Sequence, residues 1–378
     1  MPDALIAGYV RSPFAPANRG ELARVRPDEL AAHVVRRLVE DSGIDPEDIE
    51  DLLLGCAFPE GEQGLNLARL VGFLAELPQG VAGATVNRFC GSSMHSVHIA
   101  AGAIALGAGD AFVCAGVESM SRVPMAGFNP LPNPELFARM PEAYISMGET
   151  AENVAKRYQI GRDEQEAFAL GSQQRAAAAA ESGRFAGELC PIPLENGVAE
   201  HDSTARPDTT AEGLAGLGPA FDAKGTVTAG TSSPLTDGAA AVLVVSDDYA
   251  ARVGLEPLAR IRSVAVAGCA PEVMGIGPVA ATNRALKRAG IEVSDLGVVE
   301  LNEAFASQSI ACMRDLGLDP EIVNLDGGAI ALGHPLGATG ARITGKAAQL
   351  LVREGAKYAL ATQCIGGGQG IATVLEAL

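Results

Sequence analysis

The chain presents the same order of strand-like and helix-like segments twice. Apolar runs with strand character alternate with segments of helical spacing, a pattern that predicts βαβ units. The stretch around Gly43-Ile44 resembles the stretch around Gly290-Ile291, and Val86-Asn87 is echoed by Val323-Asn324. This recurrence predicts two similar α/β halves that meet within residues 247–257.

We therefore expect an N-terminal half at residues 1–250 and a C-terminal half at residues 257–378. Between about residues 121 and 236 the pattern changes to Pro-rich loops (NPLPNPE, CPIPLENG, ARPDTT) around one helix, ENVAKRYQIGRDEQEAFALGSQQRAAAAAESG. This segment is predicted to be an insertion carried by the first half. Such an insertion is a usual place for a substrate-binding lid.

Composition excludes several classes of protein. The seven cysteines are an odd number without a C-x-x-C pair, which argues against disulfides and for a reducing, cytoplasmic setting. The start of the chain does not resemble a signal peptide, and no apolar run reaches membrane-spanning length. A net charge of −18 disfavours nucleic acid and anionic membranes as partners. His95 and His98 have no third ligand nearby in sequence, so no metal site is predicted.

Three short segments each place a reactive side chain among small residues: VNRFCGSS at Cys90, GGAIALGHPLGATGAR at His334, and QCIGGGQG at Cys364. A thiol nucleophile needs a base, and a carbanion left by carbon–carbon cleavage needs an acid. A predicted helix begins at Ser92-Ser93, so we expect its dipole and a nearby imidazole to lower the pKa of the Cys90 thiol. The alternatives are buried structural cysteines and a histidine that is at the surface or satisfied in the core. A phosphate loop is disfavoured because GGGQG lacks Lys-Ser/Thr.

Eight ordered motifs run almost end to end: VNRFCGSSMHS, GVESMSRVPM, GETAENVAKRY, GTVTAGTSSPLTDGAAAV, MGIGPV, NEAFA, GGAIALGHPLGATGAR and CIGGGQG. With them the chain resembles the thiolase family of coenzyme A (CoA) thioester C-acyltransferases. The resemblance implies an α/β fold with duplicated βαβαβαββ halves, stacked in five α-β-α-β-α layers, and a loop domain inserted in the first half.

The resemblance also implies roles for five residues. Cys90 is the expected nucleophile and His334 the base that activates it. Cys364 is expected to pass a proton to or from the α-carbon of the acetyl unit. The backbone N–H of Gly366, with that of Cys90, is expected to form an oxyanion hole for the acyl-enzyme. Asn302 in NEAFA is expected to hold a water that joins His334 in a second oxyanion hole, although an Asn at a turn or cap is the ordinary alternative.

Binding residues follow from motif position alone. CoA is expected as a substrate, and no cofactor is predicted. The residues expected to contact it, each of which would also suit ordinary core or surface, are Ser233, Arg206, Phe221, Met147, Ala304 and Phe305. Ser146-Met147 and NRFCGSSM resemble the degradative 3-ketoacyl-CoA thiolases more than the biosynthetic ones. Gly218 stands where an Arg commonly precedes Pro-Ala-Phe, which departs from the family pattern.

The expected reaction is thiolysis of a 3-ketoacyl-CoA by CoA, as in fatty acid β-oxidation, to acetyl-CoA and an acyl-CoA two carbons shorter. It is ping-pong through an acyl group on Cys90. The alternatives are a biosynthetic acetoacetyl-CoA thiolase that condenses two acetyl-CoA, and a non-catalytic CoA or lipid carrier. A decarboxylating ketoacyl synthase uses Cys-His-His, whereas the third segment here offers Cys364. By resemblance we expect a homodimer or homotetramer, with a hydratase/dehydrogenase as a further candidate partner.

Overall fold

The structure, a computed structural model, describes residues 2–378. The first half of the chain builds one sheet in the order β4-β3-β5-β8-β1. Its strands are β1 (Ala4–Arg11), β3 (Asp51–Gly55), β4 (Ala82–Val86), β5 (Ala111–Ser119) and β8 (Thr236–Ser246), and the short β2 (Ala15–Pro16) pairs with β8. Strands β3, β4 and β5 run parallel, and β8 is antiparallel to β5 and β1.

The second half repeats this arrangement. The order β10-β11-β12-β9 is formed by β9 (Ala259–Gly268), β10 (Leu296–Leu301), β11 (Tyr358–Ile365) and β12 (Gln369–Glu376). Val323 makes a parallel bridge to Val299 of β10, in the place that β4 holds beside β3. The predicted correspondence of Val86 and Val323 is therefore confirmed. A short pairing of β1 with β9 joins the two sheets.

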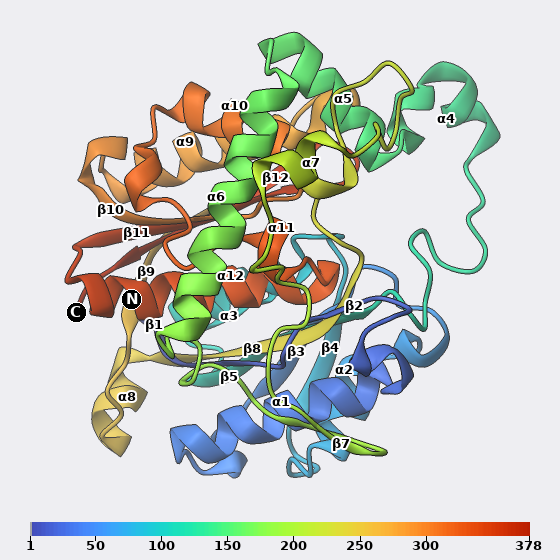
Figure 1. The fold of residues 1–378 in the computed structure, drawn as a ribbon. Coiled ribbons are helices and arrows are strands. Elements are labelled where there is room, and N and C mark those ends of the chain that lie inside the picture. The colour runs from blue at the N-terminus through green and yellow to red at the C-terminus, as the bar shows by residue number, and fades with distance from the viewer. Residues whose placement is uncertain (1) are drawn as a thin grey trace.

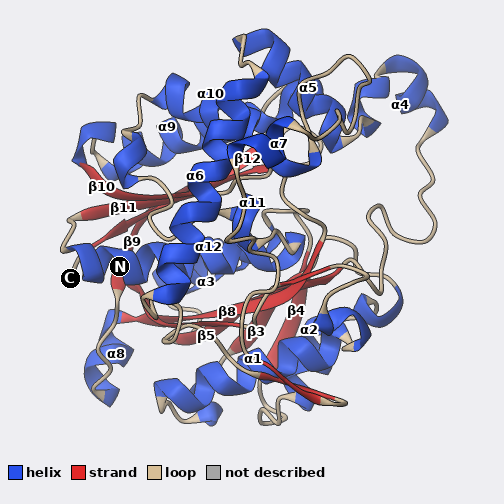
Figure 2. Cartoon of the chain, in the orientation of Figure 1, coloured by secondary structure: helices blue, strands red, loops and turns tan. Residues whose placement is uncertain are grey.

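Helices fill three layers around the two sheets (Figures 1 and 2). The middle layer holds α3 (Ser92–Ala105) and α12 (Leu336–Glu354), and α12 packs against strands of both sheets. Outside the first sheet lie α1 (Pro27–Ser42) and α2 (Leu67–Leu74), and α8 (Asp247–Val253) follows β8. Outside the second sheet lie α9 (Gly277–Ala289) and α10 (Ala306–Leu316). The predicted five-layer arrangement is confirmed.

The middle layer explains the small residues of the GHPLGATGAR motif. Helix α12 is buried on nearly all sides, because it separates two sheets and touches α3. At Gly340 a Cβ would collide with the backbone nitrogen of Met94 on α3, so only glycine allows the two helices to approach this closely. The small residues therefore serve packing, and they bring the start of α12 beside the start of α3.

The segment between β5 and β8 contains α4 (Pro134–Arg139), α5 (Met147–Tyr158), α6 (Arg162–Glu181), β6 (Ile192–Leu194), β7 (Gly197–Ala199) and α7 (Ala211–Ala215). In the second half β11 and β12 are joined by a three-residue turn instead. The prediction of one long helix here is wrong. Gln159 takes the left-handed conformation (φ 54°) and ends α5, and Gly161 precedes α6 in extended conformation.

Short elements complete the chain. One is α11 (Ala329–Leu332), which leads into the His334 loop. The others are 3-10 helices at Glu21–Arg24, Pro46–Asp48, Gly61–Gln63, Pro141–Tyr144, Ala229–Thr231, Pro271–Ile276, Val293–Asp295 and Pro320–Ile322.

Candidate active site

The three segments singled out in the sequence meet at one cavity. Cys90, His334 and Cys364 all line a cavity of about 220 Å³. Five of the six expected binding residues line it too: Met147, Phe221, Ser233, Ala304 and Phe305. The walls are mostly apolar, and the Phe221 and Phe305 rings meet edge to face with centroids 5.8 Å apart. An apolar cavity with a few convergent polar groups is the usual form of a small-molecule site.

Cys90 lies on a tight turn between β4 and α3. Phe89 before it has φ 44°, a strained conformation for a bulky residue. Two contacts hold this turn: the Phe89 N–H donates to Asn87 Oδ1 (2.9 Å), and Ser92 Oγ donates to the Phe89 carbonyl (2.5 Å). Gln363, next to Cys364, donates its amide to the carbonyl of Cys90. The nucleophile is therefore fixed from both halves of the chain.

The electrostatics of Cys90 differ from the expectation. Burial raises the pKa of its thiol to about 11, and nearby Glu118 adds to this rise. Hydrogen bonds from the backbone N–H groups of Gly366 and of Cys90 itself act in the opposite direction but are outweighed. The predicted lowering of the pKa is thus wrong, because the desolvation of a thiolate by burial outweighs these hydrogen bonds. The thiol keeps its proton until a base removes it.

His334 is held as a neutral base. Its Nδ1 lies 2.6 Å from Thr339 Oγ1, and that hydroxyl donates onward to the Pro335 carbonyl (3.1 Å), so Nδ1 carries the proton and Nε2 is the acceptor. Burial lowers the pKa of His334 to about 3, and the charge of Arg342 adds to this. Asn302 Nδ2 lies 3.4 Å from Nε2. A neutral imidazole whose Nε2 carries no proton suits a general base.

Asn302 and Cys364 complete the polar part of the site. Asn302 directly follows β10, and its N–H donates to the Thr362 carbonyl. Its Oδ1 is buried without a hydrogen-bond partner among residues 2–378, so it is free to accept from a water or ligand. Cys364 is 1% exposed, and burial, with Cys90 close by, raises the pKa of its thiol. A thiol that stays protonated suits a proton donor to carbon.

Arg206 is the expected binding residue that the cavity does not include. It is exposed, and its N–H donates to Gln173 Oε1 (2.8 Å) on α6. Among the described residues no cluster of metal ligands occurs, and His98 instead contacts Thr373 Oγ1 (2.8 Å). Within residues 2–378 every helix is too short or too polar to cross a membrane.

Several lining residues were not predicted: Met120, Met125, Ser146, Gly148, Ser232, Pro234, Leu235, Met274 and Leu336. Most lie inside the recognised motifs or next to a predicted residue, which is the one signal that the sequence offered for them. Thr339 and Gln363 were missed too, since their hydrogen bonds form only on folding.

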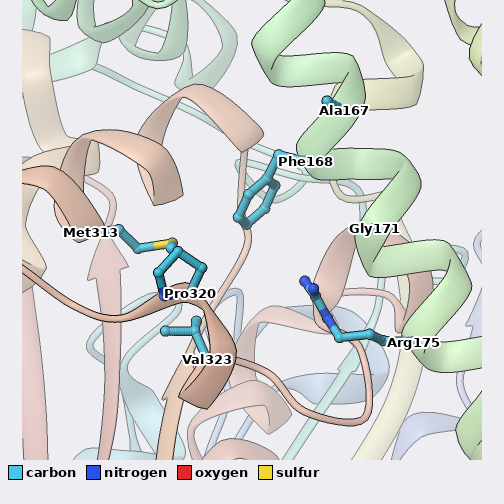
Figure 3. A pocket seen from close by; sticks show the side chains of 7 residues that line it. All are labelled: Ala167, Phe168, Gly171, Arg175, Met313, Pro320 and Val323. Carbon is cyan, nitrogen blue, oxygen red and sulfur yellow. The ribbon is translucent and has the colours of Figure 1, made fainter.

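A second, smaller cavity of about 90 Å³ lies between α6 and the α10 region (Figure 3). Phe168 and Arg175 of α6 face Met313, Pro320 and Val323 there. It holds no thiol, imidazole or carboxylate, so the candidate active site is the cavity that Cys90, His334 and Cys364 line together.

Comparisons with known proteins agree with this geometry. Residues 4–248 match the family model described as Thiolase, N-terminal domain, and residues 255–377 match Thiolase, C-terminal domain. The chain is 49% identical to the 3-ketoacyl-CoA thiolases of Bacillus subtilis and Shewanella denitrificans, each over 389 residues and the full length of both proteins.

Solved structures give the same result. Human mitochondrial 3-ketoacyl-CoA thiolase superposes with a TM-score of 0.92 at 38% identity, covering 100% of this chain and 99% of that one. Its complex with CoA superposes with a TM-score of 0.93 at 38% identity, covering 100% and 98%. The chain belongs to the thiolase family.

Proposed function

We propose that this protein cleaves 3-ketoacyl-CoA with CoA, giving acetyl-CoA and an acyl-CoA shortened by two carbons. The observation that carries the proposal is the convergence of two thiols and a neutral imidazole, Cys90, Cys364 and His334, on one apolar cavity. The full-length relatives named 3-ketoacyl-CoA thiolase support the same reaction.

In the first half-reaction His334 Nε2 removes the proton of Cys90, and the sulfur attacks the 3-keto carbon. The N–H groups of Cys90 and Gly366, which both reach the sulfur, are placed to stabilise an oxygen that gains negative charge beside it. The bond between C2 and C3 then breaks, and its electron pair stays on C2. Cys364 protonates C2, so acetyl-CoA leaves and the acyl group remains on Cys90.

In the second half-reaction CoA enters the emptied cavity. The Cys364 thiolate is the nearby base for the CoA thiol, whose sulfur attacks the acyl carbon. Cys90 leaves as a thiolate and takes back its proton from His334. Asn302 supports the first step in a different way: with Oδ1 unpaired and Nδ2 beside His334, it can hold a water against the thioester oxygen of the enolate. Each proton removed in one half-reaction is thus returned in the cycle.

CoA is proposed to lie along Met147, Phe221, Ser233, Ala304 and Phe305. The Ser233 N–H donates to the Ala304 carbonyl (3.0 Å), so the inserted segment and the second half form this wall together. The nucleotide end of CoA is too large for a cavity of about 220 Å³ and must lie outside it. Arg206 is exposed and also lies outside the cavity, so it is proposed to contact that end of CoA.

A homo-oligomer is part of the proposal. Strand β4 ends the sheet order, and its outer edge is unpaired within residues 2–378. Leu65, Phe73 and Phe89, which belong to segments adjoining this edge, are exposed. An unpaired edge flanked by apolar side chains suits a second copy of the chain. Light scattering should give a dimer or tetramer, and a monomer at micromolar concentration would contradict this. The proposal also includes a cytoplasmic location, which rests on the cysteine pattern, and a hydratase/dehydrogenase partner, which rests on the family resemblance.

The reaction is tested by following the loss of the 3-ketoacyl-CoA enolate absorbance with and without CoA. Activity that requires CoA, is lost in Cys90→Ala and yields acetyl-CoA supports the proposal. If CoA binds but is not consumed, the chain is a carrier. If acetyl-CoA alone is consumed and thiolysis is absent, condensation is the function instead.

A further inference from the structure

A buried ion pair joins β10 and α12, the two elements that flank the proposed base. Arg342 Nη1 donates to Glu300 Oε2 at 3.0 Å, and the side chains are 2% and 0% exposed. Neither residue lines the cavity. Burying two charges is costly, and such a pair often adds little to stability.

The ion pair is a second contact between the β10 and α12 regions, beside the contact of Asn302 with His334. Glu300 and Asn302 are two residues apart along β10 and its continuation, so both side chains point to the same face of the sheet. Thr339 and Arg342 are three apart on α12 and therefore share one helix face, and Thr339 holds His334. Between β10 and α12 the Asn302–His334 contact (3.4 Å) is thus followed by the Glu300–Arg342 pair (3.0 Å).

The charge of Arg342 is only partly compensated. Within the described residues, its Nε and Nη2 are buried without any hydrogen-bond acceptor. Lys346, one turn further along α12, differs because it pairs with both Glu188 and Asp326. A positive charge at Arg342 that is only partly compensated disfavours a second positive charge on the nearby imidazole.

We propose that Glu300 and Arg342 are positioning residues: their ion pair holds β10 against α12, and the Arg342 charge adds to burial in keeping the imidazole of His334 in its neutral, proton-accepting form. This inference rests on the proposed function of His334. It agrees with the direction of the His334 pKa, which burial lowers most and Arg342 lowers further.

Other groups around the pair define its charge balance. Burial raises the pKa of Glu300 to about 7, opposed by Arg342 and Lys346 and assisted by Asp326 and Glu188. Tyr9 of β1 also faces the pair, and its buried hydroxyl has no partner among residues 2–378.

Around His334 itself, the neighbours are uncharged in the resting site. They are the Asn302 amide, the hydroxyls of Thr339 and Thr236, and the protonated thiols of Cys90 and Cys364. Arg342 is therefore the charge whose removal should matter most for the imidazole.

The test compares Arg342→Met, Arg342→Lys and Glu300→Gln in the full chain. The pH dependence of single-turnover acylation of Cys90 by acyl-CoA is measured from about pH 2 to 7, a range that includes the pKa of about 3 for His334; the fall in rate at the acidic end is the acidic limb. Arg342→Met should move the acidic limb upward by about one pH unit or more, the effect of losing a nearby like charge. Glu300→Gln also breaks the ion pair but keeps the cation, so its acidic limb should not move upward. Arg342→Lys should resemble the wild type.

If Arg342→Met fails to fold, the double variant Glu300→Met/Arg342→Met replaces the pair by apolar side chains, a change that buried ion pairs often tolerate. It should show the same upward shift. Titration of His334 by NMR gives a readout independent of turnover, and with five histidines its signal can be assigned by one His334→Gln spectrum.

The inference would be overturned if Arg342→Met and Glu300→Gln had the same acidic limb of the acylation rate, or the same His334 titration midpoint by NMR. The ion pair would then have a structural role only. A wild-type protein that forms no acyl group on Cys90 would overturn the proposed function instead, while the NMR titration would still decide whether Arg342 controls the charge of His334.

Discussion

Replacing His334 by Ala should change both the rate and the pH dependence of acylation. With a pKa of about 11, roughly 0.1% of the Cys90 thiol is ionised at pH 8. The wild type avoids this limit because His334, with a pKa of about 3, is unprotonated and removes the thiol proton during attack. Without the imidazole, only the pre-ionised fraction reacts. We expect a loss of about 10²–10³-fold at pH 8.

The pH dependence is the sharper part of this prediction. The thiolate fraction rises tenfold per pH unit below its pKa, so the acylation rate of His334→Ala should rise about tenfold per unit between pH 7 and 9. The wild-type rate should be nearly flat there. Single-turnover acylation by an acyl-CoA donor, quenched and read by intact mass, measures both. A flat profile in His334→Ala, or a loss of less than about tenfold, would refute the assignment of the base.

Three further predictions test other parts of the site and the fold. Cys364→Ala should still be acylated on Cys90, but its exchange of acetyl-CoA α-protons with solvent deuterium and its thiolysis should fall by about 10²–10⁴-fold; normal exchange would assign the proton transfer to another group, with His334 the first candidate. Arg206→Ala should raise the KM for CoA more than it lowers kcat, since a contact at the nucleotide end is similar in ground and transition states; an unchanged KM would place the phosphate contacts elsewhere. Gly55→Ala should lower the stability to urea by about 1–3 kcal/mol, because the added Cβ would collide with the Ser93 backbone nitrogen, whereas Gly102→Ala, at an exposed helix position with open space, should raise it by about 1 kcal/mol.

Much of the fold follows from local sequence pattern. Strand-like apolar runs and the echo of Val86 by Val323 predict two similar sheets, since strand character and repeated order depend on neighbouring residues. The break at Gln159 did not follow in this way, because a left-handed residue between two helical segments leaves the helical spacing on each side intact.

The sequence predicts which residues form the site, but it does not predict how deeply they are buried or how burial changes their pKa values. Cys90, His334 and Cys364 were identified through their motifs, and the cavity brings them together. The direction of the Cys90 pKa depends on burial by both halves of the chain, which no local motif expresses. Two further interactions likewise join residues that are distant in sequence: the hydrogen bond of Gln363 to the Cys90 carbonyl, and the Glu300–Arg342 ion pair.

In the proposed reaction Cys90 carries the acyl group between the two half-reactions. Incubation with a 3-ketoacyl-CoA or acyl-CoA donor in the absence of free CoA should trap this intermediate, because a ping-pong enzyme accumulates it when the second substrate is missing. Peptide mapping by mass spectrometry should then find one acyl group, on the peptide that contains Cys90, and addition of CoA should remove it as acyl-CoA. An acyl group on Cys364 or another cysteine, or a label on Cys90 that CoA does not remove, would contradict the account.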